Sequence, residues 1–217
     1  MNGPHSVCRP PPSPQQQIDT RILCLEEQNL VLKLRGKDLP VQDSWMQGGK
    51  ADPYLSILKN RSSNAPLVVP KSGEYMGEVD DKNHLCVHYG KKQAQQNTLD
   101  PVWPELTIPV RSLCDNGNVY NPFLINIWDY DFECPNDDFM GFCVLTIFDL
   151  IKANLRQEGI PLQPGKAGHK WGGFLFVDEI KLHHQYSTWS RTDSINNNSF
   201  LNLIVQKGDI QAVRKRD

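Results

Sequence analysis

Short apolar runs separated by Gly, Pro, Asp and Asn are the feature of this chain that most limits its fold. Side chains at alternate positions of an extended strand point to the same face of a sheet. Two of the runs carry large apolar residues at every second position: Leu30, Leu32 and Leu34 in the first, and Phe123, Ile125 and Ile127 in the second. This period-two pattern between turn residues predicts an all-β sandwich.

We expect eight strands and one short helix. The strands are predicted at residues 20–27, 29–35, 53–59, 84–91, 104–110, 122–128, 142–148 and 171–182. A helical pattern occurs at Phe148–Gln157, inside a long loop at residues 149–170.

The length of 217 residues suits one domain with tails. Residues 1–17 hold many prolines and three consecutive glutamines, a composition that predicts a disordered tail. We expect the domain at residues 18–183 and a polar C-terminal tail, partly ordered or disordered, at 184–217.

The bulk composition excludes several classes of protein. A formal net charge of −2 argues against nucleic-acid binding, which normally needs a clustered basic excess. No apolar run approaches the length of a membrane-spanning helix, and no signal-peptide core is visible, so we expect a cytoplasmic protein. The six cysteines include no CxxC pair and are predicted to be free thiols. The oligomeric state cannot be predicted.

Two acidic clusters lie far apart in the sequence. Asp43 and Asp52 frame the stretch DSWMQGGKAD, and the second cluster is WDYDFECPNDDFMG, which has no Lys or Arg. Two unit charges about 4 Å apart repel by roughly 4 kcal/mol at an effective dielectric near 20, so such a cluster needs water, a basic partner or a divalent cation. Oxygen-only ligands on irregular loops favour calcium. The second cluster contains Asp129, Asp131, Asp137 and Asp138.

Two other functional classes compete with a calcium site. One hypothesis is that Asp129 and Asp131 act as the acid and base of a hydrolase. Such catalysis needs environments that separate the two pKa values, and the sequence implies no apolar pocket that would do so. Nucleophile-elbow, phosphate-loop and HExxH motifs are absent, so we predict no enzyme. A calcium-independent protein-interaction module on the same scaffold stays as the alternative.

The motifs, taken in order, resemble those of the C2 domain, a calcium- and phospholipid-binding antiparallel Greek-key β-sandwich. They are RGKDLPVQD, KADPYLSIL, NTLDPVW, INIWDYDF and DDFMG. The stretches RGKDL, ADPYL, TLDPVWPELTIPVRSLCD and DYD are most similar to the second C2 domain of copines. A full copine has two C2 domains and a von Willebrand factor A-like domain. We therefore expect a single-domain copine-like chain or a truncated product, and do not transfer functions of the A domain.

The resemblance implies two or three calcium ions held by five carboxylates and completed by anionic phospholipid headgroups. The implied ligands are Asp43, Asp52, Asp129, Asp131 and Asp138. The last of them is ambiguous, because counting forward from Asp131 reaches Asp137, whereas counting back from Phe-Met-Gly reaches Asp138.

The resemblance also implies a peripheral membrane protein in signalling or membrane trafficking, recruited to the plasma membrane or other membranes when calcium rises. Apolar residues beside the acidic clusters are candidates for insertion among lipid headgroups: Trp45, Met46 and Phe132. A weaker hypothesis is a phosphoinositide-binding basic patch made of Lys59, Arg61, Lys91 and Lys92, for which a solvated surface is the simpler interpretation.

Overall fold

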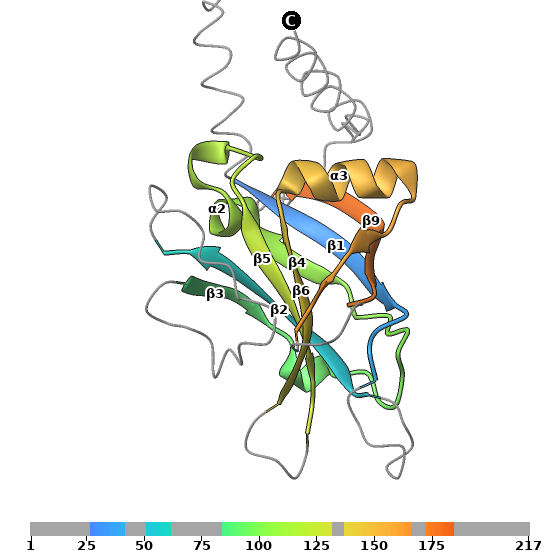
Figure 1. The fold of residues 1–217 in the computed structure, drawn as a ribbon. Helices are drawn as coiled ribbons and strands as arrows, with labels where there is room; N and C mark the ends of the chain where they lie inside the picture. The colour runs from blue at the N-terminus through green and yellow to red at the C-terminus, as the bar shows by residue number, and fades with distance from the viewer. Residues whose placement is uncertain (1–26, 42–50, 62–83, 132–136, 166–171, 185–217) are drawn as a thin grey trace, which may run out of the picture.

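The computed structural model describes residues 27–41, 51–61, 84–131, 137–165 and 172–184. Within them the chain forms two antiparallel sheets packed face to face (Figure 1). The four-stranded sheet has the order β4 (Leu106–Pro109), β1 (Gln28–Lys37), β9 (Phe174–His184) and β7 (Ile160–Pro161). The five-stranded sheet has the order β3 (His84–Tyr89), β2 (Pro53–Asn60), β5 (Phe123–Asp129), β6 (Asp138–Leu145) and β8 (Gln163–Pro164).

The predicted all-β sandwich is confirmed. Seven of the eight predicted strands have counterparts, and the eighth, at residues 20–27, falls almost wholly outside the described residues. The two-residue strands β7 and β8 were not predicted. The tails expected at 1–17 and 184–217 also fall outside the described residues, apart from His184 at the end of β9.

The alternating residues form the core between the sheets. Leu30, Leu32 and Leu34 of β1 are at most 1% exposed, and the three predicted core positions of β5 are fully buried. The opposite face of the five-stranded sheet is also apolar and buried, so β5 is buried along its whole length on both faces. This second cluster consists of Tyr54, Leu58, Leu124, Trp128, Phe139 and Phe142.

The helix α3 (Ile147–Arg156) confirms the predicted helical stretch to within one residue. Thr146 and Asp149 form a reciprocal capping box at its start, in which each side chain accepts from the other's backbone amide. The prediction of a strand at 142–148 was misplaced, because pairing with β5 starts already at Asp138 and the helix cap at Thr146 ends the strand.

The two ends of the sandwich differ. Figure 1 shows α3 and the short helix α2 (Val110–Leu113) towards one end, while the C-terminal ends of β1 and β5 lie at the other. The same end contains the 3₁₀ helix η2 (Lys91–Gln93), which follows β3; a second 3₁₀ helix, η3 (Asp115–Gly117), follows α2. We call the end with η2 the loop end.

The described residues bear on the expected lack of a membrane-spanning helix and on the expected free cysteines. Among these residues, no helix has the length and apolar character to cross a membrane. The three cysteines that the structure describes, Cys86, Cys114 and Cys143, are free thiols, as predicted. Burial raises the pKa of the Cys143 thiol to about 12, so this thiol stays protonated and unreactive at neutral pH.

Candidate functional site

Two predicted ligand residues from separate acidic clusters meet at the loop end. Asp129 ends β5 and Asp52 directly precedes β2, and the antiparallel register places Pro53 opposite Asp129. The backbone N–H of Asp52 donates to Asp129 Oδ1 at 2.6 Å, and the N–H of Tyr130 donates to the carbonyl of Asp52 at 3.1 Å. Asp129 is only 1% exposed. Residues 77 positions apart in the chain are thus joined at one point of the structure.

A third segment, which follows η2, also contacts Asp52. The N–H of Asn97 donates to Asp52 Oδ1 at 2.6 Å, and Asn97 has a left-handed φ of 54°. Backbone bonds from Gln95 to Pro53 and from Thr98 to Ala51 bind the same segment to the start of β2. Sequence reasoning missed Asn97; asparagine is enriched at positive φ, but that signal alone names no partner.

The β5–β6 register distinguishes the two neighbouring aspartates at 137 and 138. Asp138 is the partner of Asp129, and Phe139 is the partner of Trp128. Because paired residues in a sheet point to the same face, Asp138 lies on the Asp129 side and Asp137 on the opposite side. The structure thus places Asp138 next to Asp129, in agreement with the count from Phe-Met-Gly.

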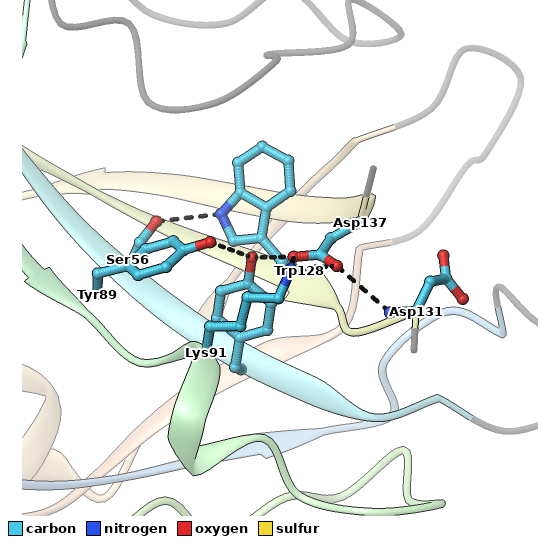
Figure 2. Close-up of polar contacts among 7 residues, drawn as sticks. Ser56, Tyr89, Lys91, Trp128, Asp131 and Asp137 are labelled. Carbon is cyan, nitrogen blue, oxygen red and sulfur yellow. Dashed lines mark hydrogen bonds and ion pairs between the residues drawn. The ribbon is translucent and has the colours of Figure 1, made fainter. Parts of the chain in front are cut away.

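Asp137 is engaged in a separate, buried network (Figure 2). Its carboxylate accepts from the Tyr54 hydroxyl at 2.7 Å and from the backbone N–H of Asp131 at 3.3 Å. The Lys91 ammonium lies 2.9 Å from Oδ1 and 2.7 Å from Oδ2. The Asp137 side chain is only 6% exposed, so it already has a cation and two further donors.

The pKa shifts of Tyr54 and Lys91 agree with this network. Burial, followed by the bonds to Tyr89 and Asp137, raises the pKa of Tyr54 far above its ordinary value, so the hydroxyl keeps its proton and donates it. Burial works against the charge of Lys91, but the hydrogen bond and charge of Asp137 outweigh it and raise the pKa of Lys91. Lys91 also lies 4.9 Å from the centroid of the Tyr130 ring.

The chemical type of the candidate ligands, carboxylate oxygens, is the type that calcium prefers. Asp52, Asp129 and Asp138 offer only carboxylate oxygens and lie at the loop end, where Asp129 and Asp138 share one face of the sheet, while Figure 2 shows the carboxylate of Asp131 pointing away from Asp137. Within the described ranges, no three acidic, His or Cys side chains lie close enough to form a ready-made metal cluster. The fifth predicted ligand, Asp43, lies outside those ranges, as do Trp45, Met46 and Phe132.

The four predicted basic-patch residues do not lie together. Lys59 and Arg61 are at the far end of β2, where Lys59 forms a 3.0 Å ion pair with Asp115. The N–H of Gly90 donates to Leu55, so Lys91 begins beside Leu55, about 13 Å along the strand from Lys59. Lys91 and Lys92 instead border a pocket of about 380 Å³ at the loop end, together with Asp52, Ala94, Gln96 and Tyr130.

Comparisons with known proteins bear on the fold. The family model described as "C2 domain" matches residues 82–162. The solved structure described as "BON1-C2B" superimposes with a TM-score of 0.52 at 18% sequence identity, covering 73% of this chain and 93% of that one. A C2 domain of plant Extended Synaptotagmin 1 matches with a TM-score of 0.41 at 18% identity, covering 74% of this chain and 97% of that one. The family match and the shared sandwich support a C2 domain in this chain, a type of module that is generally not enzymatic.

Proposed function

We propose that this chain is a membrane-binding module whose loop end docks on anionic phospholipid when calcium is bound. The proposed ligands for two or three calcium ions are Asp43, Asp52, Asp129, Asp131 and Asp138. We further propose a copine-type module, on the sequence motifs alone, that is cytoplasmic and moves to the plasma membrane or other membranes as calcium rises.

The observation that carries the proposal is the convergence of Asp52, Asp129 and Asp138. They come from two different connections between strands, yet one hydrogen bond and one register pair hold them at the same end of the sandwich. Asp129 and Asp138 are register partners on one face, so their carboxylates repel each other, and a hard divalent cation would relieve that repulsion. Bound calcium would supply positive charge and open coordination positions for headgroup phosphate or carboxylate oxygens.

The chain's own residues would orient this assembly. The amide of Asp52 fixes the Asp129 carboxylate, and the amide of Asn97 fixes that of Asp52, so neither side chain is left to rotate freely. Trp45 and Met46 belong to the β1–β2 connection and Phe132 to the β5–β6 connection. We propose that these three side chains enter the headgroup layer, where burial of one such side chain contributes roughly 1.5 to 3 kcal/mol when complete.

The alternative is a calcium-independent protein-interaction module. One observation favours it: among the residues that the structure describes, β3 is an edge strand, and its side chains Leu85 and Tyr89 are 43% and 51% exposed. Edge strands with exposed apolar residues can pair with an extended segment of another protein.

The test is co-sedimentation with vesicles containing phosphatidylserine, with calcium or with excess EGTA. We expect the wild type to pellet only with calcium, and Asp129→Asn and Asp138→Asn each to need at least about tenfold more calcium, which corresponds to about 1.4 kcal/mol. Asparagine retains an acceptor oxygen, so the bond from the Asp52 amide survives in Asp129→Asn.

Asp178→Asn is the matched control, because Asp178 lies on β9 and pairs with Arg35, away from the acidic cluster. It should pellet like the wild type. Calcium-independent pelleting of all variants would contradict the proposal, and capture of a protein partner by Asp129→Asn in EGTA would favour the interaction module.

A further inference from the structure

The ion pair between Asp137 and Lys91, hereafter the Asp137–Lys91 pair, joins two connections at the loop end. Lys91 is the first residue of η2 and is separated from β3 by Gly90 alone, and Asp137 directly precedes β6. The side chains are 6% exposed for Asp137 and 34% exposed for Lys91, so the pair is sheltered on the carboxylate side and open on the ammonium side. The Tyr54 hydroxyl, from β2, donates to the same carboxylate at 2.7 Å as a third attachment.

The same carboxylate is linked to both ends of the β5–β6 connection. It accepts from the backbone N–H of Asp131 at one end, and its own residue adjoins Asp138 at the other. Two proposed calcium ligands are therefore attached, through the backbone, to a side chain that lies on the other face of the sheet. Because successive strand residues face opposite sides, holding Asp137 on the Tyr54 side turns Asp138 towards Asp129.

We propose that Asp137 and Lys91 are positioning residues for the calcium site: their ion pair holds Asp131 and Asp138 in the binding arrangement without touching the metal. The inference rests on the proposed function. It assigns a role to the aspartate that the sequence left as an alternative ligand, and to a lysine that the sequence placed in a lipid-binding patch.

If Lys91 acts only through its charge, its removal should raise calcium affinity; if it acts by positioning, its removal should lower that affinity. The inference is therefore testable. By Coulomb's law alone, removal of a lysine near a calcium site lowers the local positive charge and strengthens calcium binding. If Lys91 acts through position, its removal leaves a buried carboxylate without its counter-cation, and the arrangement that binds calcium becomes less populated. The apparent affinity then falls in proportion to that population.

The experiment compares Lys91→Met with Lys92→Met by calorimetric titration of calcium into the lipid-free protein. Lys92 is the next residue, is exposed, and borders the same pocket, so it is a matched control for charge. We expect Lys91→Met to weaken calcium binding about three- to tenfold. Lys92→Met should leave it unchanged or strengthen it by about twofold at most. Lys91→Arg, which keeps the charge and a donor, should restore most of the affinity.

A second measurement needs no calcium. Hydrogen exchange of the Asp131 amide, followed by NMR in excess EGTA, reports its bond to Asp137 directly. We expect faster exchange in Lys91→Met and Asp137→Asn, and wild-type exchange in Lys92→Met. Circular dichroism confirms that each variant is folded.

The outcomes separate the inference from the function on which it rests. Stronger calcium binding by Lys91→Met, or the same affinity as the wild type, overturns the positioning role while the calcium site stands. Unchanged exchange of the Asp131 amide in both Lys91→Met and Asp137→Asn also overturns it. If the wild type binds no calcium, the proposed function itself fails, whatever the exchange data show about the pair.

Discussion

At the scale of single residues, Asn126 and Ser56 are neighbours with opposite energetic roles. They are register partners on β5 and β2, and both are at most 1% exposed. Ser56 Oγ accepts from the indole N–H of Trp128 at 3.0 Å. In the described part of the chain, neither polar atom of the Asn126 amide has a hydrogen-bond partner, so burial of this group is uncompensated.

The contrast gives a prediction for the free energy of unfolding. Asn126→Leu replaces the buried amide by an apolar group of similar size, and should leave stability unchanged or raise it by about 1 kcal/mol. Ser56→Ala removes the acceptor of a buried indole, and should lower stability by about 1 to 2 kcal/mol. Urea denaturation measures both values. A loss of more than about 1 kcal/mol in Asn126→Leu would show that the amide is satisfied after all.

At the scale of strands and connections, the sequence predicts periodic features well and long-range pairings poorly. The alternation in 29–35 and 123–127 locates two strands because period two follows from strand geometry. The start of β6 at Asp138 was missed, because its first residues look like the loop that precedes them. The contact between Lys91 and Asp137 spans 46 positions and depends on how β3 and β6 flank the other strands, which no local pattern encodes.

In the candidate site, too, local composition could be read from the sequence, whereas the pairing of distant residues could not. The acidic clusters made Asp52, Asp129 and either Asp137 or Asp138 candidate ligands without the structure, because clustered carboxylates are conspicuous in a sequence. The choice between Asp137 and Asp138 needed the strand register, since a shift of one residue reverses the face on which a side chain lies.

The connection between β3 and η2 depends on Gly90. Its N–H donates to the Leu55 carbonyl at 3.0 Å, and a Cβ added at Gly90 would lie 2.7 Å from that oxygen, closer than real side chains approach a backbone atom. A methyl group here must push η2 away from β2, and Lys91 with it.

We therefore expect Gly90→Ala to lower the free energy of unfolding by about 1 to 3 kcal/mol, a typical cost of overpacking. It should also weaken calcium binding as Lys91→Met does, because both changes separate Lys91 from Asp137. Chemical denaturation and calcium titration measure the two effects. A destabilised Gly90→Ala protein with wild-type calcium affinity would show that η2 does not influence the acidic cluster.

At the scale of the whole molecule, calcium would reverse the sign of the net charge. The chain carries −2 at neutral pH, and two divalent ions add +4, which gives +2. The added charge would be confined to the loop end, whereas α3 lies towards the opposite end of the sandwich (Figure 1). A molecule charged in this way is attracted and oriented by an anionic surface, and the attraction weakens as salt screens it.

The same binding should stabilise the fold, because the proposed ligands come from distant parts of the sequence and meet only in the folded chain. A ligand at one hundred times its Kd adds about 2.7 kcal/mol to the free energy of unfolding. For a domain of this size, that corresponds to a rise in Tm of about 5 to 11 °C.

Thermal unfolding in calcium and in EGTA measures the shift. It should shrink strongly in Asp138→Asn but persist in Asp178→Asn, and magnesium should produce much less of it, because its small octahedral shell fits irregular carboxylate loops poorly. An equal shift in Asp138→Asn and the wild type would place the stabilising ion away from the β5–β6 register pair.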